Sequence, residues 1–122
     1  MANIIIRIDL GTAGRIGPGK IMLLERVDDH GSISAAARSM SMSYRQAWEL
    51  IDQLNTSFKD PLVSSKAGGK SGGGARLTDF GRRILADLKA LQAEAEQATA
   101  ARLKTLERAL KILSGAKNID DN

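Results

Sequence analysis

The stretch SISAAARSMSMSYRQAWELI, residues 32–51, decides the fold of this chain. It holds two segments of helical periodicity, and the turn between them at Ser41 and Met42 is too short for anything but two helices at a steep angle. Ser43 is placed to cap the second helix, which is expected to continue to about Phe58. The spacing predicts a helix-turn-helix, although an ordinary pair of packed helices has a similar pattern.

Several positions inside this motif carry definite expectations. Ala36 stands where a helix-turn-helix needs a small side chain, and Met42 is expected to be the buried apolar residue of the turn. Ser32 or Ser34 is expected to cap the first helix. Trp48, the only tryptophan, is interpreted as a core anchor rather than as a residue that stacks on bases. The residues of the second helix that are expected to face the core are Ala47, Trp48, Leu50, Ile51 and Leu54.

A hairpin with a basic, glycine-rich loop is predicted directly after the second helix. Residues 62–66 and 75–77 are the expected strands, and AGGKSGGG, residues 67–74, is the loop between them. Residues 59–76 carry four basic groups and one acidic group, which gives +3 of the chain's net charge of +4. Such a hairpin after a helix-turn-helix is typical of a wing, and its basic loop suits a polyanion. A solvated loop without a ligand is the alternative, whereas the first glycine that a nucleotide-binding loop needs is absent.

The residues before the motif complete the expected domain. Residues 3–10, NIIIRIDL, are dense in β-branched side chains and are expected to form a strand. Pro18 fits the first turn of a helix that Gly31 would end after His30. Together these segments predict a winged helix-turn-helix domain over residues 1–77.

A long helix is predicted over residues 78–114, followed by a tail over residues 115–122 that is expected to be disordered. Thr78 is placed as its cap, and residues 82–114 contain neither proline nor glycine. At about 1.5 Å per residue such a helix is ~50 Å long and would project beyond the domain. Its apolar seam is expected to join two copies of the chain in a homodimer, with a helix folded back on its own domain as the alternative. A change of spacing at residues 99–102 predicts a bend or a stutter. The expected interface residues are Phe80, Ile84, Leu88, Leu91, Ala95, Leu103, Leu106 and Leu110.

Composition excludes several classes of function. The 122-residue chain has no cysteine, so a disulfide framework, a cysteine-ligated zinc site and thiol catalysis are excluded. With a single histidine, His30, a multi-histidine metal site or a catalytic triad is close to excluded. No apolar run approaches the ~20 residues that span a bilayer. We therefore expect a cytoplasmic protein that is not an enzyme, needs no cofactor and does not act at a membrane.

Five stretches resemble the DNA-binding half of the molybdate-responsive ModE-type transcriptional regulators, whose winged helix-turn-helix is similar to that of LysR-type regulators. The resemblance runs from about residue 3 to residue 98. It implies a mainly α fold with a small β component, in which a winged helix-turn-helix that binds double-stranded DNA precedes a long dimerisation helix. The matching stretches are NIIIRIDL (3–10), SISAAARSM (32–40), SYRQAWELI (43–51), GGKSGGG (68–74) and LTDFGR (77–82).

The second helix of such a motif enters the major groove of DNA with its N-terminal residues. Arg45 is the best candidate for bidentate recognition of guanine, and Gln46 can pair with adenine in the same way. Tyr44 and Ser43 can reach a phosphate or a thymine methyl group, whereas Glu49 either accepts from cytosine or remains solvated. The basic side chains of the wing would hold phosphates and supply affinity rather than sequence choice. The residues expected to contact DNA are Ser34, Ser43, Tyr44, Arg45, Gln46, Glu49, Gln53, Lys66, Lys70, Ser71 and Arg76.

The resemblance implies a regulator of molybdenum uptake or of molybdoenzyme genes that binds an inverted-repeat operator as a dimer. Full-length members of the family also carry two small β-barrel modules that bind molybdate. This chain ends after the long helix and has no Ser-Ala-Arg-Asn-Gln ligand stretch, so it is expected to lack the sensing modules and no small-molecule effector is evident. The alternative is an interaction module that pairs through its long helix with a sensor-bearing homologue or another partner.

Overall fold

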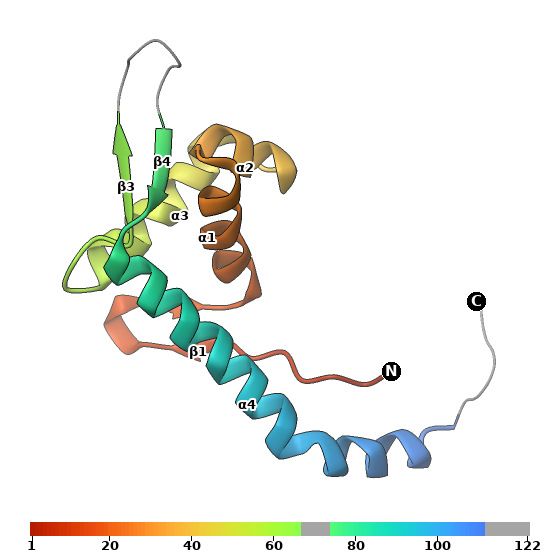
Figure 1. Cartoon of the computed structure of the whole chain (residues 1–122). Helices are drawn as coiled ribbons and strands as arrows, with labels where there is room; N and C mark the ends of the chain where they lie inside the picture. The colour runs from red at the N-terminus through yellow and green to blue at the C-terminus, as the bar shows by residue number, and fades with distance from the viewer. Residues whose placement is uncertain (67–73, 112–122) are drawn as a thin grey trace.

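The computed structural model describes residues 1–66 and 74–111, and in them the chain forms helices packed around a small core with two short antiparallel hairpins (Figure 1). The fold is mainly α with a small β component, as the sequence predicts. The elements are β1 (Ile8–Asp9), the 3-10 helix η1 (Gly11–Ala13), β2 (Arg15–Ile16), α1 (Pro18–His30), α2 (Ile33–Ser39), α3 (Tyr44–Ser57), β3 (Val63–Lys66), β4 (Gly74–Leu77) and α4 (Asp79–Ala109).

Serine caps fix the two helices of the helix-turn-helix. The Ser32 hydroxyl accepts a hydrogen bond from the backbone N–H of Ala35 at 3.0 Å, so Ser32 rather than Ser34 is the cap of α2. The Ser43 hydroxyl accepts from the N–H of Gln46 at 3.0 Å and caps α3, as predicted.

Small side chains let α2 and α3 approach each other closely. Ala36, Ala37 and Ala47 are fully buried at this crossing, which confirms the role expected of Ala36. Met42 of the turn is half-buried and packs against the core rather than lying fully inside it. The largest buried side chains, Leu23 and Leu54 among them, come from all three helices and the strands that follow. Burial of side chains of this size is the main source of stability of such a domain.

The second hairpin is the predicted wing. β3 and β4 pair antiparallel with Val63 opposite Leu77 and Lys66 opposite Gly74. The start of β4 is fastened to the residue that ends α1, because the N–H of Ala75 donates to the Gly31 carbonyl at 2.9 Å. Figure 1 shows β3 and β4 standing beside α1 and α2. The residues at its tip, 67–73, lie outside the described part of the chain.

The long helix α4 starts as expected but ends earlier. The Thr78 hydroxyl accepts from the N–H of Gly81 at 2.8 Å and caps the helix. The helix ends at Ala109, not at residue 114, because Leu110 takes an extended backbone conformation. Residues 112–122, including the expected tail, are outside the described ranges.

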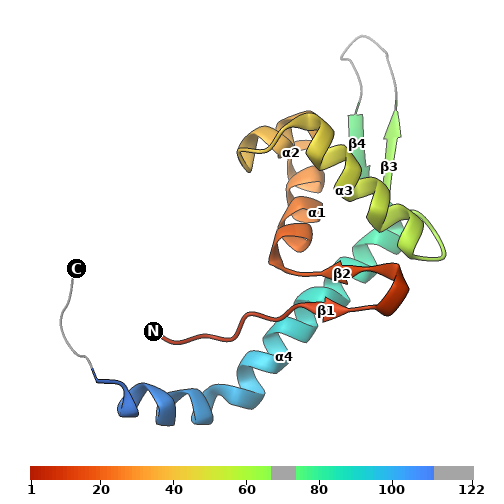
Figure 2. The same cartoon turned by 180° about the vertical axis from the view of Figure 1, so that it is seen from behind.

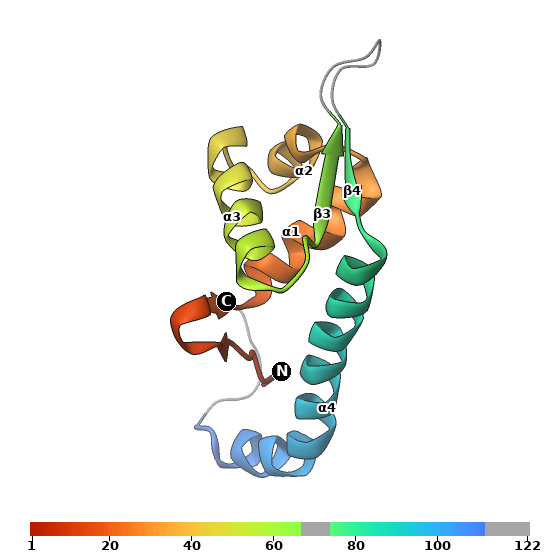
Figure 3. The same cartoon turned by 90° about the vertical axis from the view of Figure 1, so that its left-hand side faces the viewer.

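α4 changes direction in its C-terminal part, as the sequence spacing predicted (Figure 3). The Thr99 hydroxyl donates to the backbone carbonyl of Ala95 at 2.7 Å. Back-bonding of this kind competes with the helical hydrogen bond to the same carbonyl and often bends a helix.

No described helix has both the length and the apolar character needed to cross a bilayer.

The N-terminal segment is mostly not the strand that was expected over residues 3–10. Only Ile8 and Asp9 are in a strand, and they pair with β2, a strand that was not predicted from the sequence. The residues before them run along α4 (Figure 2), where the Gln92 side-chain amide donates to the Ile4 carbonyl at 2.6 Å and accepts from the N–H of Ile6 at 3.3 Å. A helix side chain therefore satisfies the backbone groups that a partner strand would otherwise pair.

An ion pair ties α1 to α4. The Lys89 ammonium donates to the Glu25 carboxylate at 2.6 Å, and this hydrogen bond, together with the opposite charge, raises the pKa of Lys89 above its usual value. Both side chains are substantially exposed, so the pair positions the helix more than it stabilises the fold.

Candidate nucleic-acid interface

The N-terminal half of α3 presents an exposed polar face. The Arg45 side chain is 88% exposed, and its Nε donates to the Glu49 carboxylate at 3.3 Å one turn along the helix. An exposed pair of this type contributes little to folding. The guanidinium therefore keeps free donors that can bind a planar pair of acceptors.

Trp48 is not the core anchor that the sequence suggested. Its side chain is 47% exposed, and Tyr44, one turn earlier on the same side of α3, is 55% exposed. Indole is too large for the tight crossing of α2 and α3, where Ala36 and Ala47 fill the space. Of the α3 residues expected in the core, Ala47, Ile51 and Leu54 are buried and Leu50 is half-buried against it.

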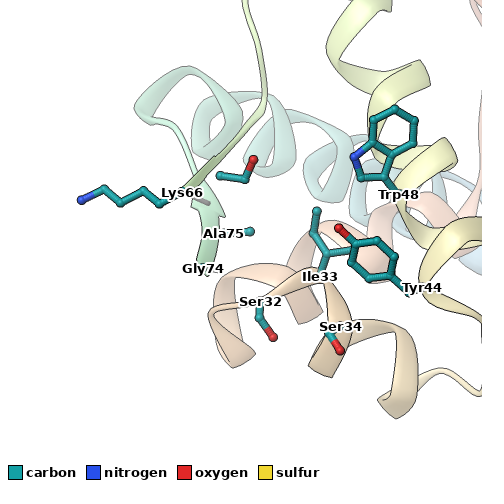
Figure 4. Close-up of a pocket in the computed structure, with 9 residues that line it drawn as sticks. Ser32, Ile33, Ser34, Tyr44, Trp48, Lys66, Gly74 and Ala75 are labelled. Carbon is teal, nitrogen blue, oxygen red and sulfur yellow. The ribbon is translucent and has the colours of Figure 1, made fainter. Parts of the chain in front are cut away.

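Tyr44 and Trp48 form one wall of an open groove between α3 and the wing (Figure 4). The groove encloses about 290 Å³, and Ser32, Ile33 and Ser34 of α2 and its cap lie beside it. Its opposite wall consists of Ser65, Lys66, Gly74 and Ala75. In Figure 4 both aromatic rings lie toward the groove, whereas the Lys66 side chain extends outward from the wing.

The wing residues that were predicted to contact DNA do not all lie on the same face of the wing. Arg76 pairs in register with Ser64 and lines a second hollow with Asp28 and Arg82 rather than the groove beside α3. Arg82 in turn forms ion pairs with Asp28 at 3.2 Å and with Asp79 at 3.5 Å. Lys70 and Ser71, which were also expected to contact DNA, lie outside the described residues.

The remaining predicted DNA contacts fall into two places. Ser34, Ser43 and Gln46 are exposed near the N-terminal end of α3, and the Ser34 hydroxyl accepts from Arg38 at 3.0 Å. Gln53 lies near the other end of α3, where it lines a hollow with Arg15 of β2. The fold therefore gathers most of the predicted residues at one end of α3 but does not bring Gln53 to the groove. Sequence reasoning missed Ser32, Ser65 and Trp48 as surface residues of this site.

The residues expected in a dimer interface fall into two groups, one packed against the core of the chain's own domain and one farther along the chain. Leu88 is only 6% exposed and belongs to the core of its own domain, and Phe80 and Ile84 are half-buried against that core. Phe80 also meets Phe58 edge to face, with ring centroids 6.5 Å apart. The first turns of α4 are thus part of the domain expected to end at residue 77. Farther along, Leu91 is exposed, Ala95 and Leu103 are half-buried, and Leu106 and Leu110 are 57% and 62% exposed.

The site has the chemistry of a binding surface. Its exposed groups are a guanidinium, amides, hydroxyls, a carboxylate and two aromatic rings, all on or beside one helix. Within residues 1–66 and 74–111, no group of three or more histidine or acidic side chains is arranged to hold a metal ion.

Comparison with known proteins places these elements in a family. The bacterial regulatory helix-turn-helix proteins of the LysR family match residues 19–82. The molybdenum transport protein ModE of Azotobacter vinelandii is 43% identical over 98 residues, which are 80% of this chain and 36% of that protein. The DNA-binding transcriptional dual regulator ModE of Escherichia coli K12 is 37% identical over 84 residues, or 69% of this chain and 32% of the regulator. The chain thus spans about a third of the length of these curated relatives.

Solved structures agree on the fold. The DNA-binding domain of CbnR in complex with DNA superposes with a TM-score of 0.51 at 20% identity, over 75% of this chain and 93% of that one. The multiple antibiotic resistance repressor MarR gives a TM-score of 0.55 at 19% identity, over 79% of this chain and 75% of that one. At these identities the likeness concerns the fold alone.

Proposed function

The chain belongs to the LysR family of bacterial regulatory helix-turn-helix proteins, and we propose that it acts as a dimeric, sequence-specific transcriptional regulator of the ModE type. One observation carries the proposal: the N-terminal half of α3 is exposed, and the wing stands beside it across an open groove. A helix of this kind enters the major groove of DNA while a wing contacts the adjacent backbone. The protein would act on chromosomal DNA in the cytoplasm.

Base recognition is assigned to the first turns of α3. Arg45 can bind the two acceptors of guanine with two parallel hydrogen bonds, and Gln46 can pair with adenine. Glu49 holds Arg45 by an ion pair in the free protein, and either accepts from cytosine or releases Arg45 on binding. Ser34, Ser43 and the wing residues Lys66 and Arg76 are assigned to phosphates, with Lys70 and Ser71 of the wing tip.

The link to molybdenum rests on the relatives. Proteins similar to this chain are named as a molybdenum transport protein and as a molybdenum-pterin-binding protein, the latter MopA of Rhodobacter capsulatus at 40% identity over 73% of this chain. We infer that the genes controlled by this chain serve molybdenum uptake or molybdoenzymes.

A homodimer would present two copies of α3 to an inverted repeat, with half-sites separated by a whole number of helical turns. The C-terminal part of α4 supports this assignment because it lies beyond the core, with Leu106 exposed on it and Leu110 exposed directly after its end. Apolar side chains repeated along a projecting helix are stabilised by packing against another helix.

The proposed function is tested by letting the protein select duplexes from a pool of random sequence. We expect an inverted repeat to be enriched and to bind at least ~10³-fold more tightly than a scrambled duplex of the same length. A palindromic promoter fragment from a molybdate-uptake operon, with and without molybdate, tests the molybdenum link separately. Selection of no sequence at all would contradict the proposed function, whereas failure of the promoter fragment alone would contradict only the molybdenum link.

Arg45→Ala is expected to weaken binding to the selected duplex by about 1–3 kcal/mol and to relax base preference at one position of each half-site. The fold should be unaffected, because the Arg45–Glu49 pair is exposed. Fluorescence anisotropy with labelled duplexes measures the loss, and Arg102→Ala on α4 is the matched control. An equal loss on the selected and scrambled duplexes would show that Arg45 contacts only the backbone.

Lys66→Ala is expected to weaken all duplexes alike and to reduce the slope of log affinity against log salt concentration by about one. The reason is that the Lys66 ammonium extends into solvent at the edge of the wing, where it can neutralise one phosphate. Titrations at several salt concentrations measure the slope, and Lys104→Ala on α4 should leave it unchanged. An unaltered slope for Lys66→Ala would remove this residue from the DNA footprint.

A further inference from the structure

We propose that the groove between α3 and the wing receives one strand of the DNA, and that Trp48 packs there against the methyl group of a thymine. This inference rests on the proposed function and makes it specific. It assigns base preference to a side chain that the sequence had placed in the core.

The first observation is the concentration of exposed aromatic surface at this groove. The chain has four aromatic residues, one tryptophan, one tyrosine and two phenylalanines. Tyr44 and Trp48 are about half exposed on one side of α3, and both line the groove (Figure 4). Exposed apolar groups gathered at one place on a small protein usually mark a binding surface.

The second observation is the position of Trp48 relative to Arg45. Three residues along an α-helix correspond to about 4.5 Å, which is close to the ~3.4 Å between successive base pairs. When α3 lies along the major groove, Arg45 and Trp48 therefore meet neighbouring base pairs. Trp48 is on the side of α3 toward the wing, so its base pair lies where the strand passes between the two elements.

The chemistry of the indole selects thymine. Thymine is the base that presents a methyl group to the major groove, and apolar side chains recognise it by contact. Trp48 offers a large apolar face and a single N–H donor, which suits a methyl group better than the acceptor pair of guanine. The hydroxyls of Ser32 and Ser65 lie at the same groove and can donate to the phosphates of that strand.

The only tryptophan of the chain serves as its own reporter. Quenching of its fluorescence by acrylamide is measured for the intact protein, free and bound to a duplex enriched by selection. We expect the quenching constant to fall on binding toward that of a buried indole. A bound protein whose indole stays as accessible as in the free state would overturn the inference while leaving sequence-specific binding intact.

A second experiment isolates the methyl group. Each thymine of the selected half-site is replaced in turn by deoxyuridine, which removes only that methyl. We expect the wild type to bind one such duplex about fourfold more weakly, as loss of one buried methyl predicts. Trp48→Ala should show no methyl dependence at that position, and Trp48→Phe should retain part of it.

The outcomes separate the inference from the function on which it rests. Equal methyl dependence in the wild type and in Trp48→Ala would assign the thymine contact to another residue and overturn the inference. If no replacement of thymine by deoxyuridine weakens binding of the protein, Trp48 does not contact a thymine methyl group, and the inference is overturned. Absence of any sequence preference in the selection itself would contradict the proposed function instead. Because the Trp48 side chain is half exposed, its replacement leaves the core packing in place.

Discussion

Gly81→Ala is expected to destabilise the protein by about 3 kcal/mol or more, enough to remove much of the stability of a small domain. Gly81 lies in the first turn of α4, directly over the chain that enters the wing. A Cβ atom there would stand 2.1 Å from the Leu62 carbonyl oxygen and 2.8 Å from its carbon. Both are backbone atoms, so no side-chain rotation can relieve the overlap.

Movement of α4 away from Leu62 would break the contacts that start the helix. The N–H of Thr78 donates to the Leu62 carbonyl at 2.9 Å, and the Thr78 hydroxyl donates to the Pro61 carbonyl at 2.8 Å. The same hydroxyl accepts from Gly81 and caps α4. We therefore expect the substitution to loosen the base of the wing together with α4.

Urea unfolding at a fixed protein concentration measures the effect of Gly81→Ala, and Gly19→Ala is the matched control. Gly19 is also in the first turn of a helix, α1, but a Cβ at Gly19 meets nothing within 4 Å. Because alanine favours a helix by up to about 1 kcal/mol over glycine, Gly19→Ala should leave stability unchanged or raise it. A similar midpoint for the two variants would contradict the close approach at Leu62.

Local signals in the sequence predicted most of the domain. Serine and threonine caps, a glycine at the end of α1 and a proline at its start are read from neighbouring residues, and the structure confirms each of them. The hairpin after α3 was also predicted from neighbouring residues, because a basic, glycine-rich loop separates two short segments that begin or end on apolar side chains. The position of Arg45 on the exposed face followed from helical spacing alone.

The predictions that were wrong depended on contacts between distant segments. Trp48 is apolar and close to the buried stripe of α3, but the space beneath it is closed by alanines of α2, which spacing within α3 cannot reveal. The N-terminal residues were expected to form a longer strand because their composition is typical of one. Their backbone instead bonds to Gln92, far along the chain, and only Ile8 and Asp9 pair with another strand.

The combined substitution Leu106→Glu and Leu110→Glu is expected to make the protein monomeric and to weaken binding to the inverted repeat by about 10²-fold. Leu106 lies on the part of α4 beyond the core, and Leu110 directly follows the end of the helix. Both leucines are more than half exposed, so their replacement should not unfold the domain. Two linked half-sites gain about 10²–10⁴ in affinity over one because the second contact is intramolecular. Binding to an isolated half-site should therefore change little.

The matched control introduces the same two charges on the opposite side of α4. Gln97 and Ala101 are exposed, and Gln97 lies nine residues before Leu106, which is two and a half helical turns. Gln97→Glu with Ala101→Glu should therefore leave the dimer and its DNA affinity unchanged. Sedimentation velocity gives the mass in solution, and anisotropy gives the affinities for the repeat and the half-site.

Measuring the mass and the DNA affinity together distinguishes an effect on dimer formation from an effect on DNA contact. Loss of the dimer with an unchanged affinity for the repeat would mean that each α3 binds independently, which would contradict the proposed two-fold arrangement. A dimer that survives both leucine substitutions would place the interface elsewhere. A wild-type chain that is monomeric alone but co-purifies with a longer homologue would favour a mixed assembly through α4, in which the exposed leucines pack against a different helix.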